Sequence, residues 1–161
     1  MITRRKGDIT LYIASDQRGA VEGLEWAASA IVKDFLRRRL FRELLREYSE
    51  STGLKGYALL NAHGGPKNNR WQFWDGKSTV DVQDWINEMD GKYLAIFLKC
   101  CNRKNQDVES DASIVLHPHS KISQLQLMLG YSPRLHFPGE GYLERNPYRL
   151  RRTIEELRRV S

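Results

Sequence analysis

The sequence predicts one α/β domain over residues 1–161, a three-layer sandwich around a mostly parallel sheet of about four strands, with an added β-hairpin. Two observations lead to this fold class. Short, continuously apolar runs alternate with segments of helical periodicity, and strands that are apolar on both faces are typical of parallel sheets covered by helices. A length of 161 residues also suits one domain with its own core.

The first half of the chain contains two predicted strands separated by a long helical region. Residues 8–15, DITLYIAS, are apolar and β-branched and predict a buried strand. Apolar residues then recur at helical spacing from about residue 20 to residue 49, and this length allows either a bend or two helices. The second strand, YALLNA, covers residues 57–62 and is followed directly by a His-Gly-Gly turn.

The second half contains a hairpin, two more strands and three helices. Two β-prone runs flank Asp75-Gly76, a dipeptide that favours a hairpin turn. Asp81 suits the N-cap of the helix that follows, and Asn146 and Pro147 suit the start of the last helix. The remaining segments are a helix at 81–92, strands at 93–98 and 112–118, and helices at 120–131 and 146–160.

Composition narrows the function classes. No apolar run is long enough to span a membrane, and the charged start MITRRKGD does not resemble a secretory signal. The chain has two cysteines, the neighbours Cys100 and Cys101, which we interpret as free thiols of a cytoplasmic protein. The net charge of +6 brings a nucleic-acid partner into consideration.

The predicted site lies where two strands end. His63 follows one apolar run, and Cys100 and Cys101 follow the next. Consecutive parallel strands are usually neighbours, and their carboxyl ends share one edge of the sheet, so we expect these residues to meet there. An imidazole can activate a cysteine thiol as a nucleophile. The glycines after His63, Gly64 and Gly65, let a substrate carbonyl approach backbone N–H groups that stabilise an oxyanion.

These blocks resemble the caspase-like cysteine peptidases, a superfamily that includes caspases, legumains, gingipains and CHAT domains. YALLNAHG is similar to the family's first block, LAIFLKCC is similar to its second, and Cys101 follows His63 by 38 positions. The resemblance implies a peptidase that acts on peptide or protein substrates. Its catalytic pair would be His63 and Cys101, with the Gly64 amide as oxyanion donor and Lys99 in the S1 substrate pocket. If Lys99 faces that pocket, we expect a preference for an acidic substrate residue.

The sequence departs from the family in two ways. The family has a further strand and helix before its His-Gly strand, whereas this chain has one long helical region there. The doubled cysteine leaves Cys100 open as the alternative nucleophile. Strand alternation places Cys100 on one face with Ile96 and Leu98, and Cys101 on the other face or turned out at the strand end. Either cysteine could instead be a small buried hydrophobic residue, and His63 a residue of a turn.

Two other patterns have competing interpretations. His117 and His119 are spaced to share a strand face and could bind one metal, but Pro118 separates them and no further ligand spacing supports a site, so we expect neither metal nor other cofactor. The aromatic cluster of the hairpin and the next helix either packs one on the other or forms an exposed ligand platform; its members are Trp71, Phe73, Trp74 and Trp85.

A second hypothesis is a non-catalytic binding module, for nucleic acid or for a protein, on the same α/β fold. Arginines concentrate in the long helical region and in the last helix, YRLRRTIEELRR, although glutamates interrupt both segments. Such charge runs are more often solvated helix faces with ion pairs than nucleic-acid sites. A third hypothesis is a catalytically degenerate member of the caspase-like group that has kept its fold.

Overall fold

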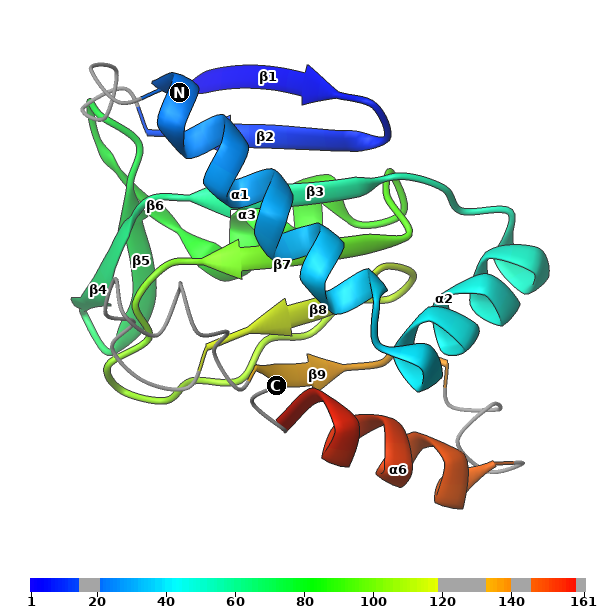
Figure 1. The fold of residues 1–161 in the computed structure, drawn as a ribbon. Helices are drawn as coiled ribbons and strands as arrows, with labels where there is room; N and C mark the ends of the chain where they lie inside the picture. Colours follow the sequence, from blue (N-terminus) through cyan, green and yellow to red (C-terminus); the bar gives the residue numbers. More distant parts are fainter. Residues whose placement is uncertain (15–20, 119–132, 140–145, 159–161) are drawn as a thin grey trace.

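The computed structural model describes residues 1–14, 21–118, 133–139 and 146–158 and confirms the α/β class. A six-stranded mixed sheet has the order β1-β2-β3-β7-β8-β9 (Figure 1). Its central strands run parallel to one another, and each edge strand is antiparallel to its neighbour. The strands are β1 (Ile2–Lys6), β2 (Ile9–Ile13), β3 (Tyr57–Asn61), β7 (Ala95–Lys99), β8 (Ile114–His117) and β9 (Arg134–His136).

The two edge strands were not expected, so the predicted sheet was too small. In β1 every residue after Ile2 is exposed, and the sequence ITRRK has a charged rather than a strand-like pattern. β9 lies in a segment that the sequence predicts as loop. Edge strands pair on one side only, and charged residues along them prevent association with other sheets, so they lack the apolar pattern of central strands.

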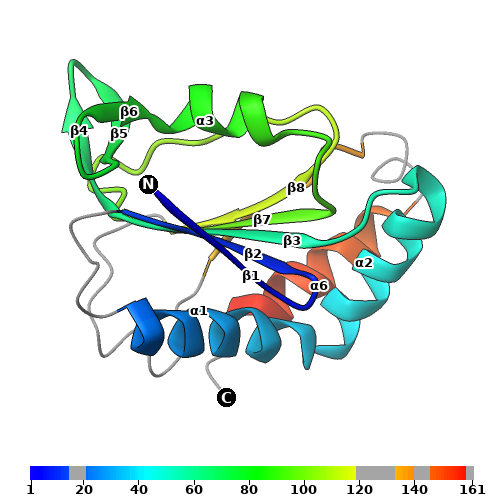
Figure 2. The ribbon, with the colours of Figure 1, turned by 90° about the horizontal axis from the view of Figure 1, so that it is seen from above.

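Helices and a second sheet cover the two faces of the main sheet, as the three-layer prediction required (Figure 2). One face carries α1 (Val21–Leu36), α2 (Arg39–Thr52) and α6 (Pro147–Arg158), and the other carries α3 (Val82–Met89) and the small sheet. Each interface is an apolar core. Phe35 and Phe41 pack with β-strand residues on the first face, and Trp85 and Ile86 do so on the second. No helix among the described residues is long and apolar enough to cross a membrane.

The long helical region forms two helices that break at Arg38. Arg38 has extended backbone angles and gives α2 no side-chain cap. The Glu156 carboxylate of α6 instead accepts hydrogen bonds from the Leu40 and Phe41 N–H groups, both at 3.2 Å. In return, Arg38 donates to the carbonyl oxygens of Glu156 at 3.2 Å and Leu157 at 2.7 Å. The start of α2 and the end of α6 therefore satisfy main-chain hydrogen-bonding groups of each other.

Glu156→Gln is expected to lower the free energy of unfolding by about 1 kcal/mol, because it removes a negative charge and one acceptor from the N-terminus of α2. The measurement is urea unfolding at neutral pH. Glu155→Gln is the matched control, since Glu155 is exposed on the same helix and should change stability by less than about 0.5 kcal/mol. Equal effects of the two substitutions would contradict the capping role.

The small sheet is antiparallel and consists of β4 (His63–Lys67), β5 (Arg70–Trp74) and β6 (Thr79–Asp81). The predicted hairpin around Asp75-Gly76 is confirmed as β5 and β6. The predicted His-Gly-Gly turn is wrong, because these residues begin β4. A turn at Asn68-Asn69 joins β4 to β5, and its positive φ angles of 53° and 59° are those of a type I′ hairpin turn.

The hairpin packs on α3, which is the first of the two alternatives left open for the aromatic cluster. Trp71, Phe73 and Trp85 are buried, and the Phe73 and Trp85 ring centroids lie 6.1 Å apart in an edge-to-face arrangement. Trp74 differs and is 41% exposed. The Asp81 carboxylate accepts the Asp84 N–H at 3.0 Å, which confirms Asp81 as the N-cap of α3. The predicted helix at 120–131 lies outside the described residues.

Candidate functional site

The segments that follow β3 and β7 meet at one edge of the main sheet, as the strand order predicted. β3 and β7 are parallel neighbours, with Asn61 opposite Lys99 at their carboxyl ends. Just beyond this pair, the Ala62 N–H donates a hydrogen bond of 3.2 Å to the Lys99 carbonyl oxygen. His63 and Cys101 therefore follow directly from two segments that are bonded to each other.

Gly64 is the point of closest approach between the two segments. A methyl group added at its Cα would overlap the Cys100 sulfur and the Cys101 carbonyl oxygen, and would lie 2.9 Å from the Cys101 nitrogen. At Gly65 the same addition meets nothing within 4 Å. β4 thus lies directly against the Cys100–Cys101 segment, and only glycine fits at position 64.

The Gly64 N–H is directed away from β5. In an antiparallel pair, residues that exchange hydrogen bonds alternate with residues that do not. The two-residue turn closes on the pair Lys67–Arg70, which is hydrogen-bonded in such hairpins. Counting back from that pair, Pro66 opposite Trp71 and Gly64 opposite Phe73 are both pairs without ladder hydrogen bonds. Pro66 suits such a position because it has no N–H to donate. The Gly64 N–H is therefore not used by the ladder.

The two thiols differ in environment. Cys100 is 1% exposed and packs in the core on the α3 face with Ile96 and Leu98, as strand alternation predicted. Burial raises the pKa of the Cys100 thiol far above its usual range, and the neighbouring Cys101 raises it further, while the Trp71 indole lowers it in part. Cys101 is only partly buried. A buried neutral thiol is a poor nucleophile, so Cys101 is the accessible candidate.

The His63 side chain is exposed on the outer face of the small sheet. Because alternate residues of a strand face opposite sides, Gly64 faces the cysteines while His63 lies on the face of its cross-strand partner Trp74. Within the described part of the chain, no hydrogen bond joins the imidazole to the Cys101 thiol. The Asp75 and Asp81 carboxylates accept backbone N–H groups of the β5–β6 turn and of α3 respectively.

The predicted substrate-binding residues lie at the same edge. Lys99 is the last residue of β7, and burial lowers the pKa of its ammonium group. Alternation places it on the face opposite Cys100. Gly65 has open space beside its Cα. Contact of either residue with a substrate stays a prediction.

Sequence reasoning missed the residues that hold the backbone around Cys101. Asn102 was part of a loop without an expected role, yet it is 1% exposed. Its amide group donates to the carbonyl oxygens of Gln106 at 2.8 Å and Pro118 at 3.0 Å, and its side-chain oxygen accepts the Gln106 N–H at 3.0 Å. The only signal in the sequence is its place, directly after a buried strand and two cysteines.

Trp71 connects the hairpin to the same backbone. Its indole N–H donates to the Cys101 carbonyl oxygen at 2.8 Å, and its main-chain N–H donates to the Gln106 side-chain oxygen at 2.8 Å. Gln106 in turn donates to the Asn69 carbonyl oxygen at 2.6 Å. Three hydrogen bonds therefore join β5 and the β4–β5 turn to the segment from Cys101 to Gln106.

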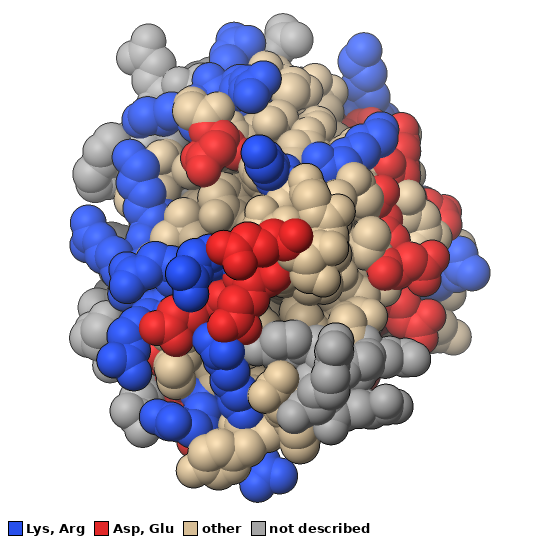
Figure 3. Space-filling view, turned by 90° about the vertical axis from the view of Figure 1, so that its right-hand side faces the viewer, with Lys and Arg blue, Asp and Glu red and all other residues tan. Residues whose placement is uncertain are grey.

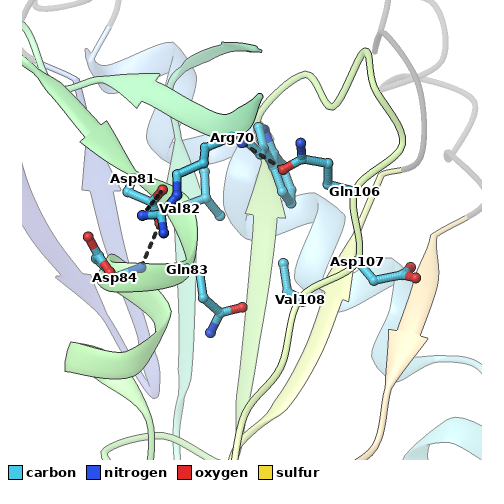
Figure 4. Close-up of a pocket in the computed structure, with 9 residues that line it drawn as sticks. Arg70, Asp81, Val82, Gln83, Asp84, Gln106, Asp107 and Val108 are labelled. Carbon is cyan, nitrogen blue, oxygen red and sulfur yellow. Dashed lines mark hydrogen bonds and ion pairs between the residues drawn. The ribbon is translucent and has the colours of Figure 1, made fainter. Parts of the chain in front are cut away.

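Trp71 and Gln106 also line a pocket of about 190 Å³ (Figure 4). Neither His63 nor Cys101 lines it. Arg70 pairs across it with Asp81 at 3.5 Å, and the Trp71–Gln106 bond forms part of its wall. Its lining residues are Arg70, Trp71, Asp81, Val82, Gln83, Asp84, Gln106, Asp107 and Val108.

The metal hypothesis gains no support from His117. This side chain is 2% exposed, its Nδ1 lies 3.0 Å from the Pro118 carbonyl oxygen, and burial lowers the pKa of its imidazole. Among the described residues, no three His, Cys, Asp or Glu side chains are grouped to hold a metal ion. His119 lies outside these residues.

One arginine of α6 pairs with glutamates of α2 across the two helices, and one arginine of α2 lies near a glutamate of its own helix. Arg149 pairs with Glu47 at 2.7 Å and with Glu43 at 3.4 Å, and Arg39 lies 3.9 Å from Glu43. Figure 3 shows basic and acidic side chains interleaved on this side of the molecule. Interleaved charges of this kind are typical of a solvated helix surface rather than of a phosphate-binding stripe.

Comparisons of the chain with protein-family models, with curated proteins and with solved structures found no match.

Proposed function

We propose that this protein is a cysteine hydrolase of the caspase-like type that cleaves peptide bonds, with Cys101 as nucleophile and His63 as general acid and base. The observation that carries the proposal is the contact of Gly64 with the Cys100–Cys101 segment, because it holds the glycine after His63 against the backbone of the nucleophile. The small sheet and α3 occupy the chain between His63 and Cys101, an arrangement similar to that of the caspase-like family, and support the proposal further.

The reaction is an acyl transfer in two steps. The Cys101 thiolate attacks the substrate carbonyl carbon and forms a C–S bond, and the Gly64 N–H binds the oxyanion. His63 donates a proton to the leaving amine as the C–N bond breaks, which requires its exposed side chain to turn from the Trp74 face of β4 toward Cys101. Water then attacks the thioester while His63 accepts one of its protons, the C–S bond breaks, and the carboxylic acid leaves the Cys101 thiolate beside a protonated His63.

The choice of Cys101 over Cys100 follows from access. A substrate carbonyl must approach the sulfur along an open path, and Cys100 is enclosed by apolar side chains on the α3 face. The partly exposed Cys101 lies beyond the last residue of β7, at the edge where Gly64 and His63 are found. Cys100 then fills the space beneath Gly64 and supports the site without reacting.

The test uses p-nitrophenyl acetate, because a small activated ester requires no knowledge of specificity. We expect a burst of p-nitrophenolate and one acetyl group on Cys101 in the wild-type protein, located by mass spectrometry. Cys101→Ala should abolish the burst, His63→Ala should slow it by roughly a hundredfold or more, and Cys100→Ala should retain it. A burst that survives Cys101→Ala, or acetylation confined to other residues, would refute the proposal.

A further inference from the structure

We infer that Trp71, Gln106 and Asn102, here called the clamp, position Cys101 for acyl transfer; this inference rests on the proposed function. None of the three touches the thiol itself. They act on the Cys101 carbonyl group and on the loop that begins at Asn102. They are therefore positioning residues rather than catalytic residues.

No strand holds Cys101. β7 ends at Lys99, and its register with β8 ends at Phe97. The orientation of the Cys101 peptide is therefore set by its two neighbours, Gly64 on one side and the Trp71 indole on its carbonyl oxygen. A bond to that oxygen restrains the Cys101 backbone, and with it the Cα–Cβ bond from which the thiol projects.

Trp71 is itself held in place by its neighbours. Trp71 is 5% exposed, and its main-chain N–H is bonded to Gln106 rather than to another strand. Gln106 is bonded to Asn69 in the hairpin turn and to Asn102 through both its main-chain groups. These bonds close a ring from Cys101 through Asn102, Gln106 and Trp71 back to the Cys101 carbonyl oxygen. A bond that is part of a closed ring limits motion more than a single bond does.

The consequence concerns acylation and not thiol reactivity in general. Acyl transfer requires the sulfur, the carbonyl carbon and the oxyanion donor to be aligned, and small displacements cost large factors in rate. Alkylation by iodoacetamide forms a C–S bond with loss of iodide and develops no oxyanion. Loosening the clamp should therefore slow the first reaction and leave the second almost unchanged.

Trp71→Phe removes the indole N–H and retains an aromatic ring. We expect acylation of Cys101 by p-nitrophenyl acetate to slow by roughly ten- to a hundredfold, and its alkylation by iodoacetamide to change by less than about twofold. Trp85→Phe is the matched control, because Trp85 is buried in the same core and packs against Phe73. It should change neither rate.

Each outcome has one meaning. A wild-type protein without a burst refutes the proposed function itself. A normal wild-type burst that Trp71→Phe leaves unchanged, or slows in parallel with alkylation, overturns the clamp alone. If circular dichroism shows that Trp71→Phe does not fold, the test uses Gln106→Leu and Gln106→Glu instead. Glutamate keeps a side-chain oxygen that accepts the Trp71 main-chain N–H, and leucine does not. Faster acylation in Gln106→Glu than in Gln106→Leu supports the clamp, and equal rates overturn it.

Discussion

Gly64→Ala is expected to abolish acylation of Cys101 and to lower the free energy of unfolding by about 1–3 kcal/mol, the usual cost of overpacking a filled site. The new methyl group would overlap the Cys100 sulfur and the Cys101 carbonyl oxygen, and the second of these is backbone that cannot rotate away. β4 and the Cys100–Cys101 segment must separate, and the oxyanion donor moves with them. Urea unfolding and the p-nitrophenolate burst measure the two effects.

Gly65→Ala is the control for this substitution. It adds the same methyl group one residue further along β4, where nothing lies within 4 Å. Stability should change by less than about 0.5 kcal/mol, and the control applies to stability alone because Gly65 is a predicted substrate-binding residue. If the two alanine variants unfold at the same urea concentration, the close packing at Gly64 is not what the site depends on.

Asn102→Ala is expected to lower the free energy of unfolding by about 3 kcal/mol. It removes three hydrogen bonds, two to part-buried main-chain groups of Gln106 and one to the buried Pro118 carbonyl oxygen, which keeps only the His117 Nδ1 contact. An unsatisfied buried polar group costs about 1–3 kcal/mol, and the loop can recover part of this by opening to water. Urea unfolding at neutral pH measures the loss.

Asn87→Ala is a suitable comparison, since Asn87 is an exposed asparagine whose side chain accepts one hydrogen bond from Gln83. We expect a change of less than about 0.5 kcal/mol there. A small effect at Asn102 as well would mean that the loop after Cys101 is not held by this side chain.

The central strands and the meeting of the site segments were predictable because they depend on patterns that physics ties to structure. Continuous apolar runs can only be buried on both faces, and parallel strands place their carboxyl ends together. The hairpin at Asp75-Gly76 and the cap at Asp81 follow from local backbone chemistry. Each of these signals lies within a few residues of the feature that it predicts.

The unpredicted features depend on contacts between distant residues. β4 was mistaken for a turn because His-Gly-Gly-Pro has no strand pattern, and its pairing is set by the Asn68-Asn69 turn that follows. The bond from Trp71 to the Cys101 carbonyl oxygen joins a hairpin residue to a backbone atom, and no residue type in the sequence announces it. The difference in burial between Cys100 and Cys101 also depends on contacts with distant residues. Strand alternation alone predicts only that the two side chains lie on different faces.

The mutual closure of α2 and α6 has a consequence for synthesis of the chain on the ribosome. The first N–H groups of α2 are satisfied by Glu156, more than a hundred positions later in translation. Until that residue has emerged, the start of α2 must be hydrated, and Arg38 lacks two of its acceptors. We therefore expect ribosome-bound chains that stop before residue 147 to be cut by proteases near Arg38, and full-length released chains to resist cleavage there.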